Sequence, residues 1–185
     1  MRRSAAAALT LTGLLAIAAC ATSFSPATIR NEIARQSGQD PQRVFEFTLG
    51  PTTMSLARAV LGGASKDGAG LPLAGLDALE LAVYDAPAGA GVDFTRMPIS
   101  GWEPVVKTRD GARSALVLVR GEQGDTLGDL VLVAGGEQQV LYARLRGTLS
   151  RKLPEALAEA VRTGGTEGVK NELLSLTAPE AAPAR

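Results

Sequence analysis

The second half of the chain alternates between apolar runs and short glycine-containing breaks. Asp110-Gly111 is a hairpin dipeptide, and Gly124 and Gly135-Gly136 mark two further turns. Turns separated by about eight to twelve residues predict an antiparallel meander. The runs around Leu116 and Leu132 are apolar at successive positions, so we expect both strands to be covered on both faces. The predicted strands are 104–108, 114–120, 127–134 and 138–147.

The first half predicts a helix, a strand, a second helix and a second strand. Ser25-Pro26 is typical of a helix start. Phe45, Phe47 and Leu49 alternate with polar residues, which indicates a strand at 44–49. An apolar helical stripe at 54–61 and a glycine-rich loop at 62–75 lead to a strand at 79–84. A strand–helix–strand unit of this length is compatible with parallel strands and a right-handed crossover.

A helix at 151–163 is predicted to follow the meander. Ser150 caps it, and Leu153, Leu157 and Val161 form one apolar stripe. We expect this helix to back a sheet that buries the leucines Leu116, Leu118, Leu130 and Leu132. The segment 93–101 has no clear pattern beyond a possible helical turn. The predicted fold class is α+β: a mostly antiparallel sheet, made of the strand–helix–strand unit and the four-stranded meander, packed against helices.

The first twenty residues have the pattern of a bacterial export signal. Arg2 and Arg3 precede an apolar run at 5–19, which is short and rich in alanine. Ile17-Ala18-Ala19-Cys20 then resembles a lipobox, in which the cysteine thiol receives the lipid. An ordinary cleaved signal with an incidental cysteine and an uncleaved membrane anchor are the alternatives. The lipobox is favoured because the chain's one Cys stands where the motif needs it.

These features divide the chain into a cleaved signal peptide at 1–19, a lipidated tether at 20–25, a single domain at 26–165 and a partly disordered tail at 166–185. Cleavage before Cys20 leaves 17 basic and 19 acidic side chains. Such a body has little electrostatic reason to bind an anionic bilayer, so the lipid on Cys20 is the expected membrane contact. By resemblance to lipoprotein sorting rules, the non-acidic Ala21 points to the outer membrane, with the domain facing the periplasm.

Composition narrows the chemistry. The chain has 19 Lys+Arg, 19 Asp+Glu, one Cys and no His, and 4% of its residues are aromatic. Without His there is no imidazole base or ligand, and one Cys makes neither an internal disulfide nor a zinc site. Balanced charge and scarce aromatic residues argue against a nucleic-acid partner. We therefore expect no metal and no cofactor.

Candidate chemistry is sparse. An envelope hydrolase would need either a Ser–Lys pair or two acids at a cleft. The candidates are Ser65-Lys66, Lys107 with Ser114, and the carboxylates of Asp77, Glu80, Asp85 and Asp93. Solvated side chains on a loop, a hairpin and a sheet rim are the simpler interpretation. We expect no catalytic site.

The last predicted strand carries a candidate binding face. Tyr142, Arg144 and Arg146 share one side of this strand with Val140. An aromatic ring and two guanidinium groups in a row suit an acidic partner, such as an envelope protein or peptide. The alternative is that the arginine stems only cover a half-exposed sheet.

Several segments together resemble a known family. They are 75–84 (GLDALELAVY), 102–107 (WEPVVK) before Asp110-Gly111, 130–136 (LVLVAGG) with Val140-Leu141, and 147–149 (GTL). Over about residues 26–163 the chain resembles the bacterial lipoprotein family catalogued as domain of unknown function 4252. The resemblance implies a small α+β envelope lipoprotein and carries no catalytic or ligand-binding residues to transfer. The sequence thus predicts a lipid-anchored, non-enzymatic binding, structural or signalling accessory module, with the envelope hydrolase as the alternative.

Overall fold

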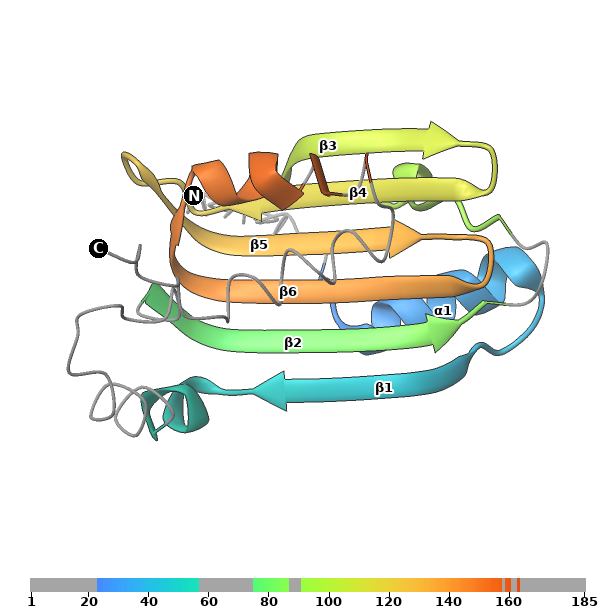
Figure 1. The fold of residues 1–185 in the computed structure, drawn as a ribbon, viewed down its shortest axis with the longest axis horizontal. Helices are drawn as coiled ribbons and strands as arrows, with labels where there is room; N and C mark the ends of the chain where they lie inside the picture. Colours follow the sequence, from blue (N-terminus) through green and yellow to red (C-terminus); the bar gives the residue numbers. More distant parts are fainter. Residues whose placement is uncertain (1–22, 57–74, 87–90, 158, 161–162, 164–185) are drawn as a thin grey trace, which may run out of the picture.

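One antiparallel sheet organises the computed structural model, which describes residues 23–56, 75–86, 91–157, 159–160 and 163 (Figure 1). Its strand order is β1-β2-β6-β5-β4-β3, so β1 and β3 are the two edges. The described strands are β1 (Gln42–Leu49), β2 (Leu76–Asp85), β3 (Glu103–Asp110), β4 (Arg113–Arg120), β5 (Thr126–Gly135) and β6 (Gln139–Ser150).

The predicted four-stranded meander is confirmed. β3, β4, β5 and β6 are neighbours in chain order, and each pairs antiparallel with the next. Gly111 turns between β3 and β4 with a φ of 58°, a left-handed conformation that glycine adopts without steric cost. The observed ends lie within three residues of the predicted ones: β3 and β5 are longer at both ends, β4 begins one residue earlier, and β6 begins one residue later and ends at Ser150.

The parallel arrangement considered for the first two strands is wrong. β1 and β2 pair antiparallel, with Phe47 opposite Leu81 and Glu46 opposite Ala82. The burial of β1 gives the physical reason. Parallel strands usually need cover on both faces, whereas nearly all of β1 is exposed, as suits an antiparallel edge strand. Residues 51–56 are helical, and the rest of the predicted helix and loop lies outside the described residues.

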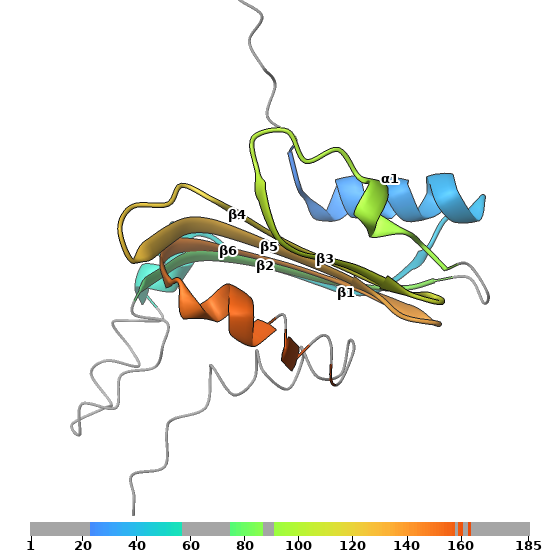
Figure 2. The ribbon, with the colours of Figure 1, turned by 90° about the horizontal axis from the view of Figure 1, so that it is seen from above.

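Helix α1 (Pro26–Ser37) lies on one face of the sheet (Figure 2). The Ser25 hydroxyl accepts a hydrogen bond from the Thr28 backbone N–H at 3.2 Å, which confirms the predicted cap. At the other end Gly38 has a φ of 71° and donates its N–H to the Ala34 carbonyl at 2.9 Å. Ile29 and Ile33 are fully buried against the sheet, so we call this side the α1 face.

The predicted C-terminal helix covers the other side of the sheet, which we call the opposite face (Figure 2). Residues 152–157, 159–160 and 163 are helical, and the Lys152 N–H donates to the Ser150 hydroxyl at 3.3 Å. Leu157 is fully buried beside Leu130 and Leu132. Within the described part of the chain, no helix has the length and apolar character needed to cross a membrane.

One detail of the predicted core is wrong. Leu116 and Leu118 are fully buried, but they pack on the α1 face, whereas Leu130 and Leu132 pack on the opposite face. The register explains this, because Leu116 lies opposite Val133 and the facing residues of paired strands point to the same side. The C-terminal helix therefore covers only one of the two leucine pairs. Val161, the signal peptide and the tail at 166–185 lie outside the described residues.

The segment between β2 and β3 completes the α1 face. Its described part contains the short 3₁₀ helix η2 (Phe94–Arg96), at the place where the sequence suggested a helical turn. Phe94 is fully buried, and the hypothetical Cβ of Gly135 would lie 3.0 Å from its ring. A larger residue at 135 would therefore push the ring away from the sheet.

Candidate functional site

The three residues of the predicted binding face do share one side of β6, but they do not form an exposed row. Tyr142 is fully buried, and the Arg144 side chain is 13% exposed. Only Arg146, at 45%, is half exposed. The expectation of exposure is thus wrong for two of the three. The physical reason is that Phe24 and Trp102, from distant parts of the chain, pack on the same face.

Phe24 is the centre of this arrangement. Its side chain is fully buried, and its carbonyl oxygen accepts hydrogen bonds from Arg144 Nη1 at 3.0 Å and from the Tyr142 hydroxyl at 3.2 Å. Phe24 was expected to belong to the tether at 20–25, so the core begins earlier than the sequence predicted. Two side chains of β6 thus hold the backbone in the place where the chain enters the domain.

Arg144 of β6 also makes a two-point ion pair with Asp129 of the neighbouring strand β5. Its Nε lies 3.0 Å from Asp129 Oδ1, and its Nη2 lies 2.7 Å from Asp129 Oδ2. Arg120 donates to the same carboxylate at 2.8 Å. The hydrogen bonds to Asp129 hold the pKa of the Arg144 guanidinium above its ordinary value. Asp129 is buried, with 6% of the residue exposed. Its negative charge is thus balanced by two arginines, one from β4 and one from β6.

Glu80 links β2 to the same network. Its Oε1 accepts from Arg146 at 2.7 Å, and its Oε2 lies 3.2 Å from the Tyr142 hydroxyl. Burial, together with the negative charge of Glu80, raises the pKa of the Tyr142 phenol. Tyr142 therefore stays neutral and serves as a hydrogen-bond donor.

Trp102 forms the lid over this cluster. Its ring meets the Phe24 ring edge-on, with centroids 5.5 Å apart. The Arg120 guanidinium carbon lies 4.4 Å and that of Arg144 lies 5.6 Å from the Trp102 centroid. We call the whole set the Phe24 network. Its members are Phe24, Glu80, Trp102, Arg120, Asp129, Tyr142, Arg144 and Arg146.

The chemical character of the Phe24 network follows from its charges. Three arginines face two carboxylates, so the network has a net charge of +1. Arg120 and Arg146, at 41% and 45% side-chain exposure, are its accessible cations. The arrangement therefore suits attachment of the segment at Phe24, where the chain enters the domain. It also suits contact with an acidic group at Arg120 and Arg146, which we call the rim of the network.

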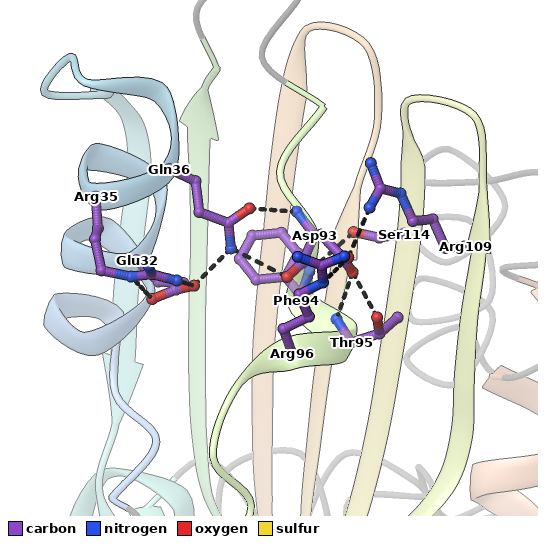
Figure 3. A network of polar contacts seen from close by, with 9 residues as sticks. All are labelled: Glu32, Arg35, Gln36, Asp93, Phe94, Thr95, Arg96, Arg109 and Ser114. Atoms are coloured by element: carbon purple, nitrogen blue, oxygen red, sulfur yellow. Dashed lines mark hydrogen bonds and ion pairs between the residues drawn. The ribbon is translucent and has the colours of Figure 1, made fainter.

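A second polar network fastens the segment before η2 to α1 and the hairpin (Figure 3). Asp93 accepts from the Thr95 N–H at 3.0 Å and from Arg109 at 2.7 Å. The Gln36 amide bonds both backbone groups of Asp93, at 2.7 Å and 3.0 Å. The Thr95 hydrogen bonds, together with Arg109, hold the pKa of the Asp93 carboxyl below its ordinary range. Asp93 is thus ionised and joins the segment before η2 to α1 and to the hairpin. We call its contacts with Gln36, Thr95 and Arg109 the Asp93 clamp.

The candidate Ser–Lys pairs are not brought together in the described structure. The Ser114 hydroxyl donates to the Val92 carbonyl at 2.6 Å and accepts from the Phe94 N–H at 3.4 Å. Lys107 lies opposite Leu116, two cross-strand pairs away from Ser114. Ser65-Lys66 lies outside the described residues.

The candidate carboxylates are also separated. Glu80 belongs to the Phe24 network, whereas Asp93 is bound by Arg109 and Thr95. Asp85 accepts from Gln139 at 3.2 Å at the end of β2, and Asp77 lies near the start of that strand. Among the described residues, no group of three His, Cys, Asp or Glu side chains is placed to hold a metal ion.

Sequence reasoning did not single out Phe24 or Asp129. Asp129 had a usable signal, because it is a charged residue within an otherwise apolar strand. Phe24 had none, since its hydrogen-bond partners are more than a hundred residues away in the chain.

Comparison with known proteins gives no information about the function of this site, because no family model, no curated protein and no solved structure matches the chain.

Proposed function

We propose that this chain is a lipid-anchored protein of the bacterial cell envelope, held to the outer membrane through Cys20 and facing the periplasm. Its domain would be a non-enzymatic accessory module that binds an envelope protein or peptide, or has a structural or signalling role. The lipobox Ile17-Ala18-Ala19-Cys20 and the resemblance to the lipoprotein family catalogued as domain of unknown function 4252 support this proposal.

The observation that carries the proposal is the burial of Phe24. This residue stands four positions after Cys20, and its side chain and carbonyl are both held by the domain. Four residues span at most roughly 14 Å. A lipid on Cys20 would therefore keep the domain close to the bilayer surface. Because the domain binds Phe24 so near the attachment point, the link between the lipid and the folded domain would be short.

The accessory role is supported by how the polar groups are used. Ser114, Asp93 and Asp129 are buried, and each is engaged by internal partners. Arg120 and Arg146 keep exposed surface, so an acidic group of a partner is the contact we expect at this rim. Tyr142 and Arg144 would then position the rim.

The anchoring is tested by fractionating cells that express the full chain or its Cys20→Ser variant. We expect the parent protein in the outer-membrane fraction, labelled by a radioactive fatty acid. The variant should be unlabelled and absent from that fraction, because the lipid supplies the membrane affinity. Ser23→Ala is the matched control and should keep the label. A Cys20→Ser protein that keeps fatty-acid label and membrane location would contradict the proposal.

The accessory role needs a separate test. Crosslinking in intact cells, followed by capture of the protein, should recover an envelope partner whose yield falls in Arg146→Glu. Arg113→Glu is the control, because Arg113 is an exposed arginine in the hairpin away from this rim. Equal recovery with both variants would reject the rim as the contact surface.

A further inference from the structure

The two edges of the sheet differ in how they are protected. A free edge presents unpaired backbone groups, and proteins commonly protect it with proline or with lysine and other charged residues. β3 has such protection, because Pro104, Lys107 and Arg109 lie along it. β1 has neither proline nor lysine, and its two charged residues, Arg43 and Glu46, pair with each other at 3.0 Å. Its bulge lies at the start, between Arg43 and Phe45, so Phe45 to Leu49 is regular.

The unprotected edge is also apolar. Phe45 and Phe47 are 49% and 38% exposed, and their rings stack with centroids 6.1 Å apart. Both pair with residues of β2 that point to the opposite face, Val83 and Leu81. Figure 1 shows β1 at the sheet edge remote from the C-terminal helix. A strand rich in aromatic and β-branched residues with a bare edge is a template for another strand.

We propose that β1 pairs antiparallel with β1 of a second copy of this chain, around a two-fold axis at Phe47. In this register Phe47 faces its own counterpart, Phe45 faces Leu49 of the second copy, and Glu46 faces Thr48 of the second copy. Every apolar residue on the opposite face of the regular segment then meets an apolar residue. Each Glu46 meets a hydroxyl and keeps its own Arg43.

Side-chain polarity, charge and strand overlap together select this register over its neighbours. A shift by one residue would place the phenylalanines against polar residues on the other face. A shift that centres the axis on Glu46 would set two carboxylates directly opposite each other, which is destabilising. An axis at Thr48 would pair only residues 47–49 of β1, whereas the axis at Phe47 pairs the whole regular segment from Phe45 to Leu49. The full segment is thus self-complementary in the register centred on Phe47, and an isologous two-fold contact requires such self-complementarity. This favours a second copy over an unrelated partner.

The contact would also join the apolar surfaces next to β1 in the two copies. Leu79, Leu81 and Val83 of β2 are partly buried and lie on the same face as Phe45 and Phe47. Two such patches meet across the axis and make one continuous apolar surface. The sheets of the two copies would join into one, and β3 would remain as the protected outer edge of each copy.

Cysteine crosslinking tests the register. The full chain with Cys20→Ser provides a background without thiols, since Cys20 is the chain's one cysteine. Directly facing Cα atoms lie about 5 Å apart, within the range that a disulfide bridges. We expect Phe47→Cys to form a disulfide-linked dimer under mild oxidation. Phe45→Cys should crosslink at least about tenfold more slowly, because the two copies of residue 45 would lie roughly 13 Å apart, beyond disulfide reach.

Val105→Cys is the matched control, because Val105 is 42% exposed on the β3 edge. It should stay reduced or crosslink at the slow rate of Phe45→Cys. A dimer that forms equally fast from all three variants would show random collision and would overturn the proposal. So would rapid crosslinking through residue 45 alone.

Sedimentation of the Cys20→Ser chain provides the second test. We expect a dimer, twice the mass of one chain, that Phe47→Lys converts to monomer while Val105→Lys does not. Circular dichroism should show both variants folded, since each position is exposed. A monomer at all concentrations would overturn the proposal, and so would a monomer that binds lipid vesicles through Phe45 and Phe47. Because this chain has no lipid site, the result does not depend on the proposed anchoring.

Discussion

The two faces of the sheet are stabilised in different ways. All five buried aromatic residues among those described lie on the α1 face: Phe24, Tyr84, Phe94, Trp102 and Tyr142. Their burial is combined with the Phe24 network and the Asp93 clamp. The opposite face is aliphatic and packs against the C-terminal helix through Leu157. Apolar packing tolerates many arrangements of similar volume, whereas hydrogen bonds and ion pairs require particular atoms to meet.

This difference has a consequence for function. The α1 face holds segments that are distant in the sequence, namely the start of the domain and the segment from Val92 to Trp102. Polar contacts give these segments one position, as the hydrogen bond from Arg144 to the Phe24 carbonyl shows. The opposite face needs no such positioning, because its helix follows β6 directly. Mutations on the two faces should therefore lower the stability of the protein in different ways.

The largest effect is expected on the opposite face. Leu132→Ala removes a fully buried side chain and leaves a cavity, which should lower the free energy of unfolding by about 2–5 kcal/mol. That is a large part of the roughly 5–15 kcal/mol available to a domain. Denaturant unfolding followed by circular dichroism measures it. Leu56→Ala, at a side chain that is 65% exposed, is the control and should change little. Equal stability of the two variants would contradict the core described here.

The next effect tests whether polar pairing on the α1 face is structural. Arg144→Ala leaves the buried carboxylate of Asp129 with Arg120 as its remaining arginine. We expect a loss of about 3 kcal/mol. Arg146→Ala, at a half-exposed side chain, should cost less than about 1 kcal/mol. The same unfolding measurement separates them. Similar small losses for both would mean that Arg144 is solvated, as the sequence alone suggested.

The Asp93 clamp should make the α1 face sensitive to acid. The pKa of the Asp93 carboxyl is lower in the folded protein than in the unfolded chain, where it is about 3.9. Its contribution is therefore present above about pH 4 and is lost as the pH falls through the lower folded value. Asp93→Asn should cost about 1.5–3 kcal/mol at pH 7, and less at pH 3.

Melting temperatures of parent and variant at pH 7 and pH 3 measure this difference. Asp110→Asn is the control, because Asn-Gly keeps the hairpin turn and Asp110 is exposed. It should leave the melting temperature unchanged at pH 7. A gap between parent and Asp93→Asn that stays constant with pH would show that the clamp does not depend on ionisation.

The smallest effect concerns the Tyr142 hydroxyl. Tyr142→Phe removes its hydrogen bond but leaves the pairs Arg146–Glu80 and Arg144–Phe24 in place, so we expect a loss of about 1 kcal/mol. The pKa of this phenol is raised on folding, so its contribution is present below about pH 10 and is lost as the pH rises further. The variant should thus lose less stability than the parent above pH 10. A steeper alkaline loss in the variant would contradict the burial of Tyr142.

Sequence patterns by themselves determined the local elements of this protein. The meander, its glycine turns, the cap at Ser25 and the helix after Ser150 all follow from residues close together in the chain. Such elements depend on periodicity and turn chemistry, which a short window contains. The face shared by Tyr142, Arg144 and Arg146 was predictable for the same reason.

Only the tertiary structure decided what lies on each side of these elements. Alternation along a strand says which side chains share a face, but the cover over that face comes from elsewhere in the chain. Phe24 and Trp102 turn the predicted exposed row on β6 into a buried network, and the register sends Leu116 and Leu130 to opposite sides. β1 pairs antiparallel with β2 at the sheet edge, where its side chains remain exposed, and no local pattern contains that information.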